Sequence, residues 1–332
     1  MFTVMLKTLT AAAMVLACVP AAHAERPVHT YSIVARDAAT GELGVAVQSH
    51  WFSVGSIVTW AEAGVGAVAT QSFVDPAYGP RGLELMRRGV PAPKALEQLV
   101  AKDAQRHGRQ IAMIDASGRV SAYTGKSAIA AAGHHVGASF SVQANMMASE
   151  KVWPAMAAAF QSTKGDLADR MLAALEAAEK AGGDVRGRQS AAILIVKAKG
   201  TGRPWAGADR LFDLRVEDHP APVEELRRLM RLQRAYAHAN RGDELMTEQK
   251  VDLALKEYEA ASRLAPEIVE LPFWHAVTLA SIGRENEAMP IFRAVFAKEP
   301  VWAELLERLP AAGLFPDDRA LIERIKAQSP KP

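Results

Sequence analysis

Short segments rich in Val, Ile and small apolar residues, separated by polar or glycine-containing turns, occupy residues 30–72. TYSIVARD (30–37) and ELGVAVQS (42–49) flank one turn, and VGSIVTW (54–60) and GVGAVATQS (64–72) flank a second. Strands rich in Val and Ile, joined by turns that contain Gly, are typical of β-hairpins. The pattern predicts two consecutive hairpins. The small apolar residues on both faces of 64–72 predict a strand buried between layers.

Helical spacing of apolar residues follows, over LELMRRG (83–89) and PKALEQLVAKDA (93–104). Asp166 is a suitable N-cap for a later helix that ends near Gly182. The other predicted elements, in order, are a hairpin over 109–125, a strand over 136–145, a helix over 150–162 and strands over 187–197 and 211–219. Strands and helices in separate groups predict an α+β fold, in which two packed sheets are covered by helices on both sides.

From Pro222 to the end the chain is predicted to be helical, and it contains an internal repeat. Ala254, Tyr258, Ala261 and Pro266 recur 34 residues later as Ala288, Phe292, Val295 and Pro300. Gly283 lies where the two helices of a unit would turn. A period of 34 residues with this order resembles the tetratricopeptide repeat. Two units are fewer than such repeats usually need, so we expect them to pack on a long helix starting at Pro222.

The first 24 residues have the pattern of a secretory signal peptide. Lys7 precedes an apolar stretch, and Ala22-His23-Ala24 fits a cleavage site before Glu25. We therefore expect a periplasmic or secreted protein. Cys18 gives a rough match to a lipoprotein signal, but Leu16 is bulky where such signals carry a small residue, so no lipid anchor is expected.

Composition narrows the classes of function. The chain is 49% hydrophobic and 23% charged, with a formal net charge of +2 and no block of like charge. We therefore expect no binding to nucleic acid or to a membrane surface. Cys18 is the only cysteine, so cleavage before Glu25 leaves no disulfide, no cysteine nucleophile and no thiolate metal site.

Familiar catalytic motifs are missing. The sequence has no zinc-protease motif, phosphate-binding loop or dinucleotide fingerprint. His134 and His135 are adjacent, so on a strand they would point to opposite faces and could not bind one metal ion together. We predict no metal site and no cofactor.

Thr30 is the candidate nucleophile that this composition leaves. An N-terminal threonine carries its own base, because the free α-amine can take the proton of the hydroxyl. Thr30 begins the first predicted strand, and Ser32 shares its face. The competing interpretation is that both are ordinary strand residues, since Thr is common in strands.

The segments TYSIVARD, GELGVAVQS, AGVGAVATQS with DPAYGPRGL, VQAN, GRQSAAILIV and DLRVEDHPAPVEELRRL resemble a bacterial family, domain of unknown function 1028. The resemblance runs from Thr30 to about Leu232. It implies a four-layer αββα sandwich of the N-terminal-nucleophile (Ntn) hydrolase kind. We therefore expect a signal peptide over 1–24, an Ntn-hydrolase-like domain over 25–232 and a tetratricopeptide-like helical domain over 233–332.

Two features depart from what the resemblance implies. Cleavage before Glu25 would leave five residues in front of Thr30, so a second cut after His29 would be needed to free the amine. Gln48 stands where proteasome-like relatives carry an Asp, and SIVTW offers no lysine.

Other polar residues near strand ends complete the predicted site. Asn145 and Gln143 are candidate oxyanion donors, and the candidate substrate-binding residues are Ser32, Ser49, Arg188 and Ser190. Two functions stay open. One is hydrolysis of a small amide or peptide-like substrate by Thr30. The other is a non-catalytic binding or scaffold role, in which the sandwich cleft and the helical repeats hold a ligand or a protein partner. The sequence leaves the oligomeric state open.

Overall fold

The computed structural model describes residues 30–203 and 207–329. The predicted signal peptide, Cys18 and the predicted cleavage site before Glu25 lie outside the described residues. Within the described part of the chain, no helix is long and apolar enough to cross a membrane.

Within residues 30–203 and 207–329, ten strands form two antiparallel sheets. The six-stranded sheet has the order β10-β9-β2-β1-β8-β7, and the four-stranded sheet has the order β3-β4-β5-β6. In chain order the strands are β1 (Thr30–Arg36), β2 (Leu43–Ser49), β3 (Thr59–Glu62), β4 (Gly66–Ser72), β5 (Arg109–Asp115), β6 (Val120–Thr124), β7 (Gly133–Gly137), β8 (Phe140–Ala144), β9 (Ser190–Val196) and β10 (Arg210–Val216). The first strand of the chain is therefore central in its sheet.

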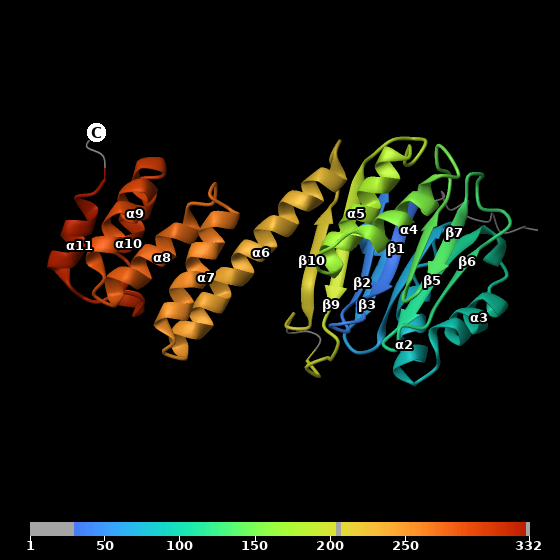
Figure 1. Ribbon diagram of the computed structural model, residues 1–332, viewed down its shortest axis with the longest axis horizontal. Coiled ribbons are helices and arrows are strands. Elements are labelled where there is room, and N and C mark those ends of the chain that lie inside the picture. The colour runs from blue at the N-terminus through green and yellow to red at the C-terminus, as the bar shows by residue number, and fades with distance from the viewer. Residues whose placement is uncertain (1–29, 204–206, 330–332) are drawn as a thin grey trace, which may run out of the picture.

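The two sheets pack face to face and are covered by helices on both outer faces (Figure 1). Apolar residues of β1, β2, β4, β5 and β9 fill the space between the sheets. Helices α2 (Tyr78–Arg87) and α3 (Ala92–Lys102) pack on the four-stranded sheet, and α4 (Val152–Ser162) and α5 (Leu167–Lys180) pack on the six-stranded sheet. The predicted α+β layers are confirmed. Asp166 caps α5 as predicted, because its side chain accepts a hydrogen bond from the N–H of Asp169.

Two predicted strands were wrong in detail. The segment 54–60 begins with the one-turn helix α1 (Gly55–Val58), and only its last two residues belong to β3. This segment crosses from one sheet to the other. A Cβ at Gly55 would lie 2.5 Å from Ala192 on β9, so glycine allows the close approach.

The second error concerns the single strand predicted over 136–145, which is part of the hairpin β7–β8. Its turn lies at residues 138–139, where Ser139 has a φ of 59°. The turn carries neither Gly nor Asn, so the usual hairpin signal is missing from the sequence.

The C-terminal region is all helical, as predicted. It consists of α6 (Pro222–Thr247), α7 (Val251–Leu264), α8 (Glu270–Ser281), α9 (Glu285–Lys298), α10 (Val301–Leu306) and α11 (Arg319–Lys326). Gly283 has a φ of 81° at the turn between α8 and α9. The repeated apolar positions on α7 and α9 are buried: Ala254, Tyr258, Ala261, Ala288, Phe292 and Val295.

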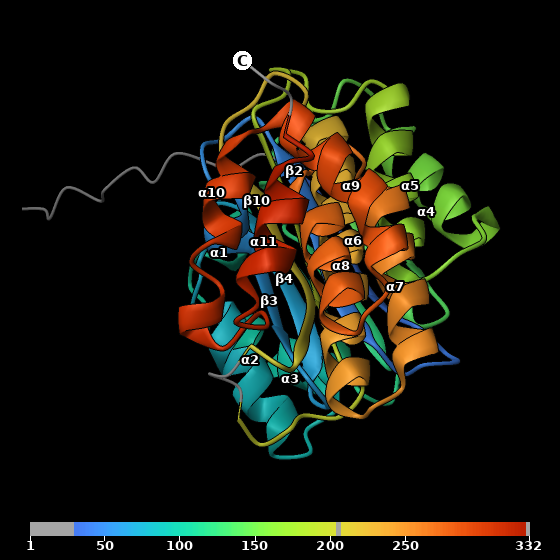
Figure 2. The same cartoon turned by 90° about the vertical axis from the view of Figure 1, so that its left-hand side faces the viewer.

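Helix α6 joins the sandwich to the C-terminal helices (Figures 1 and 2). Near its start, Val223, Leu226 and Met230 are buried in the core of the six-stranded sheet. Further along, Ala235 packs with residues of α7 and α8, and Leu245 packs with residues of α7. The predicted boundary between residues 232 and 233 thus falls inside one continuous helix, which contributes to both cores.

Truncation of Leu226 is expected to test this shared packing. Leu226→Ala removes a fully buried side chain of α6 from the sandwich core, so it should lower the free energy of unfolding by about 2–5 kcal/mol. Arg228→Ala, on the exposed side of the same helix, should change it by less than about 0.5 kcal/mol. Denaturant unfolding measures both, and equal effects would contradict the packing described.

Candidate functional site

Four polar residues form a row across the six-stranded sheet at the end where β1 begins. The strand register pairs Thr30 with Ser49 and Ser49 with Ser190, and the N–H of Asn145 donates to the carbonyl of Thr30 at 3.1 Å. All four residues are buried. Alternate residues further along β1, β2 and β9 belong to the core between the sheets, so the row faces the four-stranded sheet.

A second row lies one step further into the sandwich. Ser32 and Gln143 are register partners on β1 and β8, and Gln143 Nε2 donates to Ser32 Oγ at 2.6 Å. Ser141 donates to Gln143 Oε1 at 3.1 Å, and Ser32 donates across to Gln71 Oε1 on β4 at 2.5 Å. Six of the seven site residues predicted from the sequence therefore lie in one buried layer between the two sheets.

Gln71 and Gln110 complete this layer from the four-stranded sheet. They are buried register partners on β4 and β5. Gln71 Nε2 donates to Gln110 Oε1 at 2.7 Å and to the carbonyl oxygen of Thr30 at 3.1 Å. Asn145 Nδ2 donates to the same two oxygens at 2.9 and 3.4 Å. Two side-chain amides from opposite sheets thus converge on the carbonyl of Thr30.

Backbone carbonyls fix the direction of the Gln110 amide. Its Nε2 donates to the carbonyl oxygens of Ala144 at 2.9 Å and Gly133 at 3.2 Å. A carbonyl oxygen only accepts hydrogen bonds, so Nε2 must lie on that side and Oε1 on the other. Oε1 in turn requires donors, and Gln71 and Asn145 must therefore turn their NH₂ groups toward it. Both N–H bonds of the Asn145 amide are engaged in this arrangement.

The contacts described for the Thr30 side chain and carbonyl are with neutral polar groups. Its Oγ1 donates to Ser49 Oγ at 3.2 Å, and the amides of Gln71 and Asn145 hold its carbonyl. These groups supply dipoles, but none of them is a proton acceptor with a pKa near neutrality. A threonine hydroxyl in such a setting becomes a good nucleophile only when a base is added beside it.

His134 lies at the outer end of the network. Its Nδ1 is 2.8 Å from Thr124 Oγ1, which accepts from Gln110 Nε2 at 2.9 Å. Desolvation and the neighbouring His135 lower the pKa of His134, so it is neutral at pH 7. His135 lies beside Phe140 instead, with ring centroids 6.0 Å apart. Among the described residues, no group of three or more His, Cys, Asp or Glu side chains is placed to hold a metal ion.

The backbone is strained at the ends of the two strands that position the side-chain amides of Gln71 and Asn145. Ser72, directly after Gln71, has a φ of 70°, and Met146, directly after Asn145, has a φ of 58°. Residues other than glycine rarely adopt this left-handed conformation, and it costs roughly 1–3 kcal/mol when they do. The Ser72 hydroxyl is also buried without a hydrogen-bond partner among the described residues. Strain of this kind concentrates at functional sites.

Arg188, the seventh predicted site residue, is placed away from the other six. It forms an ion pair with Glu179 of α5, and Glu179 also accepts a hydrogen bond from the Tyr31 hydroxyl. Tyr31 lies in the core beneath α4 and α5, on the opposite face of β1 from Thr30. Burial, followed by the charge of Glu179 and its hydrogen bond, raises the pKa of Tyr31 well above its usual value.

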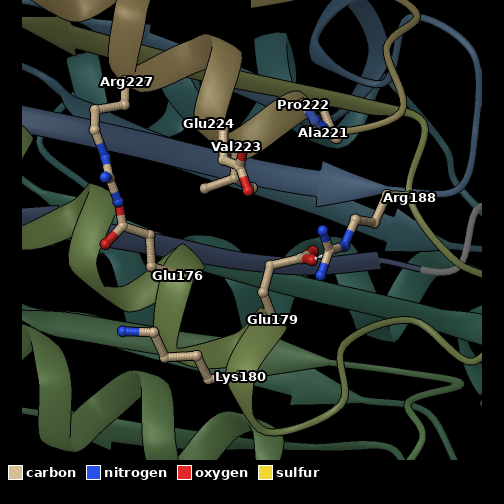
Figure 3. A pocket seen from close by; sticks show the side chains of 9 residues that line it. All are labelled: Glu176, Glu179, Lys180, Arg188, Ala221, Pro222, Val223, Glu224 and Arg227. Atoms are coloured by element: carbon tan, nitrogen blue, oxygen red, sulfur yellow. Dashed lines mark hydrogen bonds and ion pairs between the residues drawn. The ribbon is translucent and has the colours of Figure 1, made fainter.

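Arg188 instead lines a cavity of about 200 Å³ between α5 and the start of α6 (Figure 3). Arg227 pairs with Glu176 on another side of this cavity.

Gln48 is buried on the same face of the sheet as Tyr31, its register partner. The position that departs from the proteasome-like pattern therefore faces the helices, and it is Ser49 that lies beside Thr30.

Sequence reasoning missed Gln71 and Gln110. Both residues lie on predicted strands, and neither is among the predicted site residues. One signal was available. Both glutamines lie on buried strands, at positions that share a face with Ala69 and Ala112 of the inter-sheet core. A glutamine on a buried face needs partners, which indicates a polar layer.

The chain belongs to a protein family without an assigned function. The sequence profile of DUF1028, described as a family of unknown function, matches residues 30–226. The match starts at the first residue of β1 and ends within α6. The C-terminal helices α7 to α11 lie outside it.

A solved structure agrees with this membership. It is the crystal structure of protein SPO2555 from Silicibacter pomeroyi, also assigned to DUF1028. It is 30% identical, with a TM-score of 0.54, over 60% of this chain and 84% of that chain. Comparison with curated proteins gave no match.

Glycine at position 72 is expected to stabilise the protein. Ser72→Gly removes both the left-handed strain and the unpartnered hydroxyl, which together outweigh the entropy lost by a glycine, so the free energy of unfolding should rise by about 1 kcal/mol. Ser72→Ala removes only the hydroxyl and should give a smaller gain. Thermal and denaturant unfolding compare the two, and a destabilised Ser72→Gly variant would show that the strain was misassigned.

Proposed function

We propose that this protein is an exported amide-bond hydrolase of the Ntn type, in which Thr30 becomes the nucleophile after the bond between His29 and Thr30 is cut. One observation carries the proposal. Thr30 is the first residue of a central strand, and its hydroxyl lies in a buried polar layer whose side-chain amides converge on its own carbonyl.

The chemistry follows from the neutral surroundings of Thr30. Cutting the preceding peptide bond creates an α-amine on the residue that carries the hydroxyl, and this amine supplies the missing base. The amine takes the hydroxyl proton while Oγ1 attacks the amide carbon of the substrate. The departing amine of the substrate then takes that proton and leaves, and water hydrolyses the resulting ester.

Asn145 is the proposed oxyanion donor, with Gln143 behind it in the same layer. The contact from Asn145 Nδ2 to the Thr30 carbonyl, at 3.4 Å, is longer than the contact to Gln110 Oε1, at 2.9 Å, so it is the one that a substrate oxyanion would replace. Preorganised amide donors of this kind contribute about 3–4 kcal/mol to transition-state stabilisation. Ser32, Ser49 and Ser190 lie on the same face of the sheet and are the proposed substrate contacts. Arg188 does not share this role, because it pairs with Glu179 of α5 on the helical side of the sheet.

A second function, binding of a peptide or protein by the C-terminal helices, is favoured by a groove among α7, α8 and α9. It has a volume of about 600 Å³ and combines apolar residues such as Leu255, Leu279 and Ile291 with charged residues such as Lys256 and Glu259. The 34-residue period supports a tetratricopeptide-like role for these helices. Under this proposal the sandwich is a scaffold and Thr30 keeps its preceding residues.

Acylation of Thr30 by a β-lactone tests the hydrolase proposal. A chain prepared to begin at Thr30 should gain the whole mass of one lactone, because Oγ1 attacks the ring carbonyl and the ring ester bond breaks. A chain that keeps residues 25–29 should gain nothing. Intact mass followed by peptide mapping locates the acyl group.

Two threonine variants control this experiment. Thr30→Ala should abolish acylation, and Thr40→Ala, in the exposed turn after β1, should leave its rate unchanged. Failure of the chain that begins at Thr30 to react, or equal labelling of Thr30→Ala, would refute the nucleophile.

A further inference from the structure

We infer that Gln110 is the positioning residue of the Thr30 site. Its amide, held between the backbone carbonyls of β7 and β8, turns the amides of Gln71 and Asn145 toward the carbonyl of Thr30. This inference rests on the proposed function for its catalytic consequence, but the positioning itself can be measured in the uncut chain.

The network has one direction because backbone carbonyls, which only accept hydrogen bonds, lie at both of its ends. The carbonyl of Thr30 accepts from the NH₂ groups of Gln71 and Asn145, whereas the serine hydroxyls donate or accept as required. The carbonyls of Gly133 and Ala144 have no such freedom. The Gln110 side chain, from β5, spans the gap between the sheets: its nitrogen donates to the carbonyls of β7 and β8, and its oxygen accepts from Gln71 and Asn145.

Cleavage before Thr30 makes this restraint more important. In the uncut chain the preceding peptide holds Thr30 from its amino side. Its carbonyl oxygen accepts from the N–H of Asn145 and from the side chains of Asn145 and Gln71, and these three contacts do not depend on the bond that is cut. Gln110 sets two of these three donors, so it acts on the nucleophile through them without touching a substrate.

Two substitutions at position 110 separate positioning from simple loss of packing. Gln110→Met keeps the length of the side chain but removes both ends of the amide. Ile114→Val is the matched control, since Ile114 lies on the same strand and faces the same inter-sheet core, four residues away. The control loses one methylene group and touches none of the amides.

The first readout is independent of any reaction. In nuclear magnetic resonance spectra of the full chain, the side-chain NH₂ protons of Gln71 and Asn145 should exchange slowly with solvent. Gln110→Met should accelerate this exchange by at least about tenfold, and Ile114→Val should not. Equal protection in Gln110→Met and Ile114→Val would overturn the positioning role, whether or not Thr30 is a nucleophile.

The second readout is the rate of Thr30 acylation by a β-lactone in the cut chain. Gln110→Met should slow it about 10- to 100-fold, because a small misplacement of a reacting group costs this much. If the unsubstituted cut chain does not react, the hydrolase proposal fails, and the exchange measurement still decides the role of Gln110. Slow exchange retained together with a slow reaction would also contradict the inference.

Gln110→Glu gives a pH signature that a purely structural role would not. The neutral acid can donate one O–H to a carbonyl and still accept from Gln71 and Asn145, whereas the carboxylate cannot donate at all. Burial raises the pKa of such a carboxyl group. The acylation rate of Gln110→Glu relative to the unsubstituted chain should therefore recover as the pH falls, while the relative rate of Gln110→Met stays flat. If the relative acylation rates of both variants were independent of pH, the inference would be contradicted.

Discussion

The fixed direction of one buried amide organises the space between the two sheets. Gln110 can satisfy the carbonyls of Gly133 and Ala144 only with its nitrogen. Its oxygen therefore accepts from Gln71 and Asn145, whose NH₂ groups also face the carbonyl of Thr30. Leaving any of these buried groups unpaired would cost about 1–3 kcal/mol. The requirement that every buried amide has a hydrogen-bond partner therefore also orients the donors around Thr30.

Local patterns in the sequence were sufficient to predict the layers of sheets and helices. Hairpin turns with glycine, helical spacing and the Asp166 cap all led to elements that the structure contains. The errors came from tertiary context. Residues 54–58 have strand-forming side chains, but they form a helical turn where the chain passes between sheets, and the turn at Ser139 has none of the residues that usually mark one.

The sequence predicted the site residues that lie on the six-stranded sheet, but not those on the four-stranded sheet. Thr30, Ser32, Gln143 and Asn145 follow the alternation of strands whose family resemblance was visible, and the structure brings them together. Gln71 and Gln110 were missed because their importance depends on which sheet lies opposite, and no local pattern encodes that. Arg188 was predicted for the same reason, because it lies next to the start of a strand. Its side chain instead pairs with Glu179 on the helical face of the sheet.

The mass of the mature protein tests the central claim most directly. If Thr30 is freed and then held by its carbonyl contacts, the mature protein recovered from the periplasm or the medium should begin at Thr30. Intact mass and N-terminal sequencing read this without any knowledge of the substrate. A mature chain that begins at Glu25, with His29 still joined to Thr30, would contradict the account and leave the polar layer as the packing of a binding protein.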